Sequence, residues 1–185
     1  MSAKRIKDKI LYLRLKQKDK DAFVKAYDSY IDDIYRFIYF KVGSKEDAED
    51  ITSQVFLKSW DYIQNNNLLE YKTIKPFFYR VARNIIIDYY RSKSDKENIS
   101  INNEENRIDI IDEKIDLNKE VDLKNDIKNL QEAMQELKNE YREVLLLRYI
   151  NELSVKEIAV ILEKNKGNVR VLIYRAIKAL KNIVN

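Results

Sequence analysis

Glycine and proline are almost missing from this sequence. Only two glycines and one proline occur among 185 residues, and these are the residues that tight turns between strands most often require. Apolar residues instead recur at steps of three and four, the period of a helix packed on one side, and the alternation typical of strands is missing. The sequence therefore predicts an all-α protein, and its apolar fraction of 45% is sufficient for a buried core.

The charge changes sign twice along the chain. Residues 1–93 contain 19 basic and 13 acidic residues, residues 94–126 contain 5 and 11, and residues 127–185 contain 11 and 7. The middle segment has no aromatic residue and no wide apolar face, which is typical of a segment without a core of its own. We therefore expect two helical domains, 1–93 and 127–185, joined by an acidic flexible linker at 94–126. Basic domains also favour a polyanionic partner such as nucleic acid.

Cysteine and histidine are both absent. Without cysteine there is no disulfide and no thiolate metal site, and without histidine the commonest general base and transition-metal ligand is missing. The basic N-terminus lacks the apolar run of a signal peptide, and no segment has the uninterrupted apolar length of a membrane span. The sequence thus predicts a cytoplasmic protein that is not an enzyme, with no catalytic residue, metal, cofactor or membrane insertion.

Three helices are predicted in the first domain, at about 22–41, 45–64 and 76–92. Gly43 provides a stop for the first helix, and Ser44 is a candidate N-cap for the second. The predicted core stripe of the first helix is Phe23, Tyr27, Tyr30, Ile34 and Ile38. The predicted inward residues of the second are Ala48, Ile51, Val55 and Trp60. The third helix begins at proline, which lacks an N–H that the first turn does not need.

The second domain carries a helix-turn-helix pattern. Helices resume at about residue 127, and a further helix spans about 139–149. Ser154 and Glu157 then form a capping box at the start of one short helix, and Asn165 can cap the next helix after a short turn. Stepping about 100° per residue along this last helix separates its apolar side completely from its basic side. The basic side consists of Arg170, Val171, Tyr174, Arg175, Lys178 and Lys181.

That basic side is typical of a DNA-reading helix. Ordinary surface helices mix charges of both signs, and this side has none of the opposite sign. Cations supply affinity for phosphates, while Tyr174 and Val171 can contact base edges or thymine methyl groups in the major groove. A solvated face of an ordinary helix is the alternative explanation of the cations alone.

The third helix of the first domain carries a second basic stripe. Arg80, Arg83, Asn84 and Arg91 lie opposite its apolar residues, and aromatic and basic residues precede the helix. Cations, an amide and exposed aromatic rings are the groups that hold single-stranded nucleic acid. Phenylalanines and tyrosines in such a helix are more often core residues, so this stripe alone is also compatible with ordinary packing.

Three stretches in this order resemble the sigma-70 family of bacterial transcription initiation factors, in particular its extracytoplasmic-function (ECF) group with regions 2 and 4. DAEDITSQVFLKSW (47–60) is similar to region 2.2, and PFFYRVARNIIIDYYRSK (76–93) is similar to regions 2.3 and 2.4. LSVKEIAVILEKNKGNVRVLIYRAIKAL (153–180) is similar to region 4.2. The resemblance implies a factor that directs core RNA polymerase to promoters and aids duplex opening.

The resemblance also implies three groups of site residues. The outer face of region 2.2 binds core polymerase, which corresponds here to Asp50, Gln54 and Lys58. Regions 2.3 and 2.4 hold the melted −10 element, with a base extruded near Asn84; the implied residues are Tyr71, Lys72, Arg80, Arg83, Asn84 and Arg91. Region 4.2 reads the −35 element; the implied residues are Asn168, Arg170, Val171, Tyr174, Arg175 and Lys178. The implied partners are core RNA polymerase, promoter DNA and, in many members, an anti-sigma factor.

This chain departs from the family pattern at three positions. Phe77 stands where the family usually has tryptophan, Asn168 replaces a frequent threonine, and Val171 replaces a frequent serine, so no promoter sequence can be transferred from the family. Two other functions stay open from the residues alone. A helix-turn-helix regulator acting without polymerase would not need the second basic stripe, and an interaction protein would show no DNA sequence preference.

Overall fold

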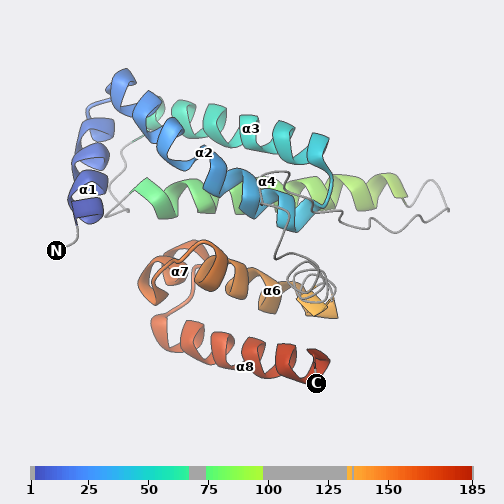
Figure 1. Ribbon diagram of the computed structural model, residues 1–185. Coiled ribbons are helices and arrows are strands. Elements are labelled where there is room, and N and C mark those ends of the chain that lie inside the picture. The colour runs from blue at the N-terminus through green and yellow to red at the C-terminus, as the bar shows by residue number, and fades with distance from the viewer. Residues whose placement is uncertain (1–2, 67–73, 98–132, 135, 185) are drawn as a thin grey trace, which may run out of the picture. The chain divides into compact units, whose positions relative to one another are not determined.

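The computed structural model describes residues 3–66, 74–97, 133–134 and 136–184, and all regular structure within them is helical, as predicted (Figure 1). The chain divides into two compact units, residues 1–108 and 109–185. Most of the predicted linker lies outside the described residues, so the boundaries at 94 and 126 stay a prediction. Among the helices described, none has the length and apolar character needed to cross a membrane.

The described part of unit 1 contains four helices, in which α2, α3 and α4 pack against one another and α1 packs on α2 and α4. Phe78 of α4 lies at the centre, where its ring centroid is 5.1 Å from that of Phe56 on α3 and 5.7 Å from that of Tyr30 on α2. One aromatic side chain thus holds three helices together. The helices are α1 (Ala3–Lys16), α2 (Lys20–Val42), α3 (Lys45–Asn65) and α4 (Ile74–Glu97).

Short-range capping determines where α2 and α3 begin and end. The Asp19 carboxylate accepts a hydrogen bond from the Ala22 N–H at 3.1 Å, and Gly43 adopts a left-handed conformation with φ of 76° at the end of α2. The Ser44 hydroxyl accepts from the Asp47 N–H at 3.2 Å. The predicted stop at Gly43 and the predicted cap at Ser44 are confirmed.

Four features of unit 1 differ from the sequence prediction. Helix α1 was not predicted, although its Tyr12 and Leu15 are buried. The predicted core residue Tyr27 is 39% exposed, and Trp60 is only half-buried. Tyr30, Ile34 and Ile38 of the predicted stripe on α2 are buried as expected, but before Tyr30 the buried residues are Ala22 and Ala26, one position earlier than Phe23 and Tyr27. Helix α4 continues to residue 97, four residues into the predicted linker, where no glycine or proline interrupts it.

Unit 2 is built around α6 (Asn139–Leu145), which packs against the last helix. The chain continues through the π-helical turn η1 (Leu146–Ile150), α7 (Val155–Ile161) and α8 (Lys166–Val184). In η1 the Asn151 N–H donates to the carbonyl of Leu146, five residues earlier, at 2.9 Å. The predicted α-helix at 139–149 is therefore α-helical only to residue 145. The helix predicted to begin at about residue 127 lies mostly outside the described residues.

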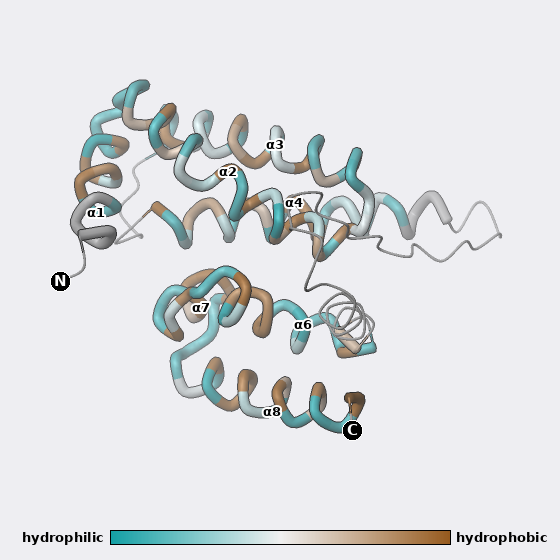
Figure 2. Tube along the Cα trace, viewed as in Figure 1, coloured by the Kyte–Doolittle hydropathy of each residue, from teal (hydrophilic) through white to brown (hydrophobic). Residues whose placement is uncertain are grey.

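Two arginines of unit 2 donate hydrogen bonds to backbone carbonyls outside its regular helices. The Arg142 Nε donates to the carbonyl of Met134 at 2.7 Å, and the Arg148 Nη1 donates to the carbonyl of Leu153 at 3.0 Å. Each satisfies a backbone acceptor that ends a helix or follows one. Figure 2 shows apolar residues concentrated along these helices, with hydrophilic residues interleaved at helical spacing along α8.

Candidate nucleic-acid and polymerase interfaces

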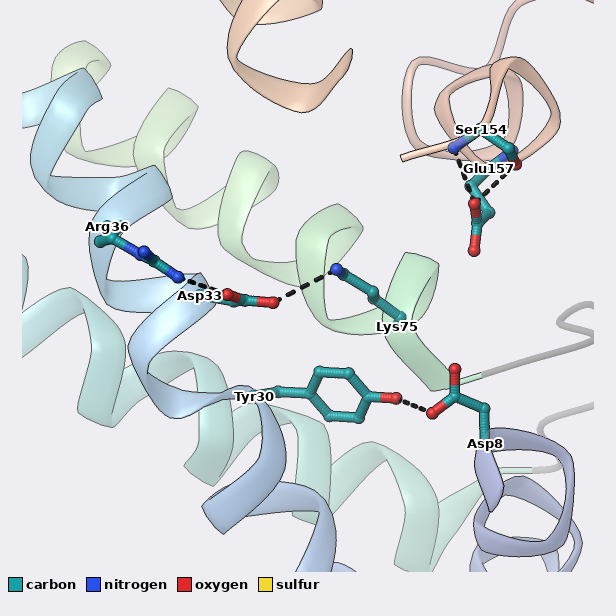
Figure 3. A network of polar contacts seen from close by, with 7 residues as sticks. All are labelled: Asp8, Tyr30, Asp33, Arg36, Lys75, Ser154 and Glu157. Atoms are coloured by element: carbon teal, nitrogen blue, oxygen red, sulfur yellow. Dashed lines mark hydrogen bonds and ion pairs between the residues drawn. The ribbon is translucent and has the colours of Figure 1, made fainter. Parts of the chain in front are cut away.

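Side-chain caps fix the start of α7 and the start of α8. The Ser154 hydroxyl accepts from the Glu157 N–H at 3.3 Å, while the Glu157 carboxylate accepts from the Ser154 N–H at 2.8 Å (Figure 3). After the turn at residues 162–165, the Asn165 side-chain oxygen accepts from the Asn168 N–H at 2.8 Å. Both predicted caps are confirmed: the first determines where α7 begins, and the second where the candidate recognition helix α8 begins.

Gly167, in the first turn of α8, has no side chain that would crowd the Asn165 cap. A Cβ at this position would lie 3.2 Å from the side-chain oxygen of Asn165, tighter than most such contacts, so a larger residue would crowd the cap. The N-terminal end of α8 therefore stays narrow, which suits a helix whose first turns approach another surface closely.

The two faces of α8 are as the spacing predicted. Val169, Leu172 and Ala176 are buried against the unit. The residues predicted to read DNA are all exposed, and the apolar and aromatic ones are among them, with Val171 48% and Tyr174 69% exposed. The exposed set is Asn168, Arg170, Val171, Tyr174, Arg175 and Lys178. Unit 2 thus presents one continuous basic surface on its last helix.

On α4 the predicted −10 residues have mixed exposure. Arg80 and Arg83 are half-buried, whereas Asn84 and Arg91 are exposed. Tyr71 and Lys72 lie outside the described residues. Phe77 is 2% exposed and its ring centroid lies 5.3 Å from that of Tyr62 on α3, so the departure from tryptophan falls inside the core.

Helix α4 is held at both ends by polar contacts that the sequence did not predict. Lys75 near its start lies 3.2 Å from the carboxylate of Asp33 on α2, and Asp33 also pairs with Arg36 at 2.7 Å (Figure 3). Further along, the Tyr89 hydroxyl donates to the carboxylate of Asp47 on α3 at 2.8 Å. These contacts fix the direction in which the α4 arginines project from unit 1.

The predicted polymerase-binding residues on α3 border an apolar groove. Asp50, Gln54 and Lys58 are exposed and recur at steps of four, so they form one row along the helix. The adjacent row on α3, one residue earlier at each step, lines a groove of about 870 Å³ between α2 and α3. The apolar lining is Phe23, Val24, Tyr27, Ile31, Phe56, Leu57 and Trp60.

The groove exposes large side chains. Leu57, at the edge of the groove, is 70% exposed. Exposed apolar side chains that gather in one patch are typical of contact surfaces. Burial, with the charge of Glu49 and the nearby Tyr39, raises the pKa of the Tyr35 phenol above its ordinary value of 10.0, so this lining residue remains a neutral hydroxyl at physiological pH. The sequence did not predict the groove, because Phe23 and Tyr27 fit the predicted core stripe of α2 and line the groove only once α3 is in place.

Sequence models of known families match both units. The model described as Sigma-70 region 2 matches residues 26–96, and that described as Sigma-70, region 4 matches residues 127–180. The ECF RNA polymerase sigma factor SigM of Bacillus subtilis is 30% identical over 165 residues, which cover 86% of this chain and 93% of SigM. The ECF RNA polymerase sigma factor BldN of Streptomyces coelicolor is 29% identical over 90% of this chain, which spans only 61% of BldN.

A solved structure shares the fold. The sigma factor RpoE of Bartonella quintana, crystallised with the anti-sigma factor NepR, superimposes with a TM-score of 0.72 at 16% identity, covering 88% of this chain and 96% of RpoE. The matched family models account for the two units, and the relatives cover nearly the whole sequence. This chain therefore belongs to the sigma-70 family of RNA polymerase sigma factors, and to its ECF group.

Proposed function

We propose that this chain binds core RNA polymerase, directs it to promoters through α8 and helps to open the duplex through α4, while the polymerase performs the chemistry. It acts in the cytoplasm, where bacterial polymerase transcribes. The observation that carries the proposal is the exposed basic face of α8, with Val171 and Tyr174 within it, directly after the turn that Asn165 caps. A helix placed this way can enter the major groove.

In this proposal α8 reads the −35 element as duplex DNA. Arg170, Arg175 and Lys178 supply phosphate affinity or guanine contacts, and the uncharged residues between them contact base edges. The buried residues of α8 fix the helix on unit 2, so the exposed side is free to follow the groove.

Helix α4 holds the −10 element after melting. Asn84 is exposed beside the half-buried Arg80 and Arg83, an amide next to two cations. Extruding a base costs a few kcal/mol, and hydrogen bonds to its edge together with charge on the backbone offset that cost. The contacts of Lys75 and Tyr89 with α2 and α3 keep this surface rigid, so little ordering is needed on binding.

Core polymerase binds unit 1 at the groove and the row beside it. An amphipathic helix of the polymerase can place its apolar side against Leu57 and Trp60, with polar contacts to Asp50, Gln54 and Lys58. RpoE was crystallised with an anti-sigma factor, and we propose that an inhibitor of this chain would compete for the same groove.

Run-off transcription tests the proposal. The purified chain is mixed with bacterial core polymerase and a library of templates with randomised promoter regions. We expect transcripts from a subset of templates that share two spaced elements. If the chain did not raise transcription of any template above the level reached by core polymerase alone, the proposal would be contradicted. Sequence-specific DNA binding in the absence of core polymerase would instead favour a helix-turn-helix regulator that acts without polymerase.

A further inference from the structure

Helix α1 has one face that the described part of unit 1 leaves exposed. Tyr12 and Leu15, on its other side, are buried where α1 packs on α2 and α4. Ile10 and Leu13 are three residues apart, so they are neighbours on the helix surface, and they are 54% and 50% exposed. The exposed residues form what we call the outer face of α1: Lys9, Ile10, Leu13, Lys16 and Gln17.

Cations dominate this end of the chain. Residues 4–20 contain eight basic and two acidic residues. Both carboxylates are engaged within unit 1, because Asp8 accepts a hydrogen bond from the Tyr30 hydroxyl and Asp19 pairs with Arg14 at 2.7 Å while it caps α2. Among the described side chains, the outer face of α1 therefore carries cations and no carboxylate. The exposed lysines on it and just after it are Lys9, Lys16, Lys18 and Lys20.

This combination of side chains fits an anionic lipid surface better than it fits a nucleic acid. Phosphates of either kind attract lysines, but a nucleic-acid backbone offers no apolar partner to Ile10 and Leu13. In a bilayer, aliphatic side chains enter the boundary between the headgroups and the acyl chains, while anionic headgroups attract the lysines around them. Lysine stems can lie along that boundary and keep their ammonium groups at the lipid phosphates.

We propose that the outer face of α1 binds the surface of bilayers that contain anionic phospholipids. The helix lies parallel to that surface, since its 14 residues span about 21 Å and none of the described helices can cross a membrane. A contact made by two aliphatic side chains and a few lysines is weak and reversible, so the chain exchanges between membrane and solution. The inference does not depend on the proposed function, in which α1 has no part.

Vesicle flotation with the whole chain tests the proposal. The chain is mixed with large unilamellar vesicles made of phosphatidylcholine alone, or of phosphatidylcholine and phosphatidylglycerol in equal parts. We expect it to float with the anionic vesicles and to stay in solution with the neutral ones. The bound fraction should fall as salt is added, because salt screens the attraction of the lysines. Equal binding to both kinds of vesicle, or binding to neither, would overturn the proposal.

Two leucine variants locate the contact on the molecule. Leu13→Asp places a carboxylate at the centre of the outer face, and its affinity for anionic vesicles should fall by about tenfold. Leu57→Asp is the matched control, since it adds the same charge at an exposed leucine in the groove between α2 and α3; it should bind vesicles like wild type. Both leucines are exposed, so both variants should keep nearly the wild-type midpoint in urea denaturation.

Neutral substitutions separate the two components of the contact. Leu13→Gln removes the aliphatic group without adding charge, and it should also weaken binding to anionic vesicles. Lys9→Gln and Lys16→Gln should each weaken it by about fivefold. If the lysine variants lost binding while Leu13→Gln did not, the outer face would attract any polyanion by charge alone, and its assignment to a lipid surface would be wrong.

Two further results would also overturn the inference. Equal losses for Leu13→Asp and Leu57→Asp would mean that the added charge acts on the chain as a whole and not at α1. Vesicle binding that Leu13→Asp leaves unchanged would mean that another basic surface, such as that of α8, holds the lipid. Failure of the chain to direct transcription would contradict the proposed function and leave these vesicle measurements unaffected.

Discussion

Helices α4 and α8 have the same sequence pattern and different surroundings. Both carry a basic stripe opposite an apolar one, but α8 buries only three residues, on one side, whereas α4 lies against all three other helices of unit 1. The arginines of α8 are exposed, and two of those on α4 are half-buried. A stripe on an outer helix can therefore be altered without affecting the fold, while a stripe on a central helix cannot be separated from stability.

The largest expected effect is on the core of α4. Phe78→Ala should lower the free energy of unfolding of unit 1 by about 3–5 kcal/mol, because it leaves a cavity among three helices. Urea denaturation followed by circular dichroism measures this. Tyr174→Ala on α8 is the matched aromatic control and should change stability by less than about 0.5 kcal/mol. Equal losses for both variants would remove the contrast between the two helices.

The next effect concerns recognition without a change in fold. Arg175→Ala should cost about 1–3 kcal/mol in binding to a selected −35 element, with unchanged affinity for core polymerase. Binding of labelled promoter duplex by the holoenzyme measures the first quantity, and co-elution with core polymerase measures the second. An equal loss on scrambled −35 sequences would show that this arginine contacts only phosphate.

A variant in the groove of unit 1 should weaken the binding of core polymerase without affecting the binding of DNA. Leu57→Asp should weaken the binding of core polymerase by about tenfold, because it places a charge in an apolar contact, while DNA reading by α8 is unaffected. Leu13→Asp on α1 is the control, since Leu13 is 50% exposed and does not line the groove. If both variants bound core polymerase like wild type, the groove would not be the docking site.

The smallest expected effect is on the pH dependence of stability, which should differ between the caps of α2 and α8. Hydrogen bonds from Ala22 and Arg14 lower the pKa of Asp19 below its ordinary value of 3.8, so the capping carboxylate stabilises the folded state at pH values above that value. This contribution is lost as the pH falls below 3.8 through the lowered folded-state pKa. The stability difference between wild type and Asp19→Asn should therefore shrink on acidification, as measured by urea denaturation at a series of pH values.

Asn165 caps α8 with an amide, which does not titrate. The stability difference between wild type and Asn165→Ala should accordingly stay constant over the same pH range. A pH-dependent difference for Asn165→Ala would mean that a neighbouring carboxylate, and not the amide, determines the strength of that cap.

The sequence predicted the features that depend on neighbouring residues. The caps at Ser44, Ser154 and Asn165 involve contacts over three residues, and the faces of α8 follow from periodicity because only one side of that helix is covered. Tyr27 on α2 and Trp60 on α3 were misplaced because the packing of the two helices on each other decides which side of each is buried. The groove was missed for the same reason, since it exists only where two helices meet.

Roles in the candidate site were less accessible to prediction. Lys75 has the charge expected of a nucleic-acid contact, yet it pairs with Asp33, forty-two residues away in sequence. Phe77 stands in the stretch that resembles regions 2.3 and 2.4, yet it is buried against Tyr62 of α3. In both cases the distinction depends on a long-range neighbour, which periodicity within one helix does not reveal.

The π-helical turn η1 adds one residue to the path of the chain between α6 and α7. A π turn contains one residue more than the α-helical turn it replaces, and one residue corresponds to about 100° of rotation around a helix. Deleting a single residue within 146–150 would thus convert the turn to α-helix and turn the start of α7 around the axis of α6, against the direct packing of α8 on α6. The extra residue of η1 therefore sets the direction in which the chain leaves α6, and the length of this turn is matched to the packing of α8 on α6.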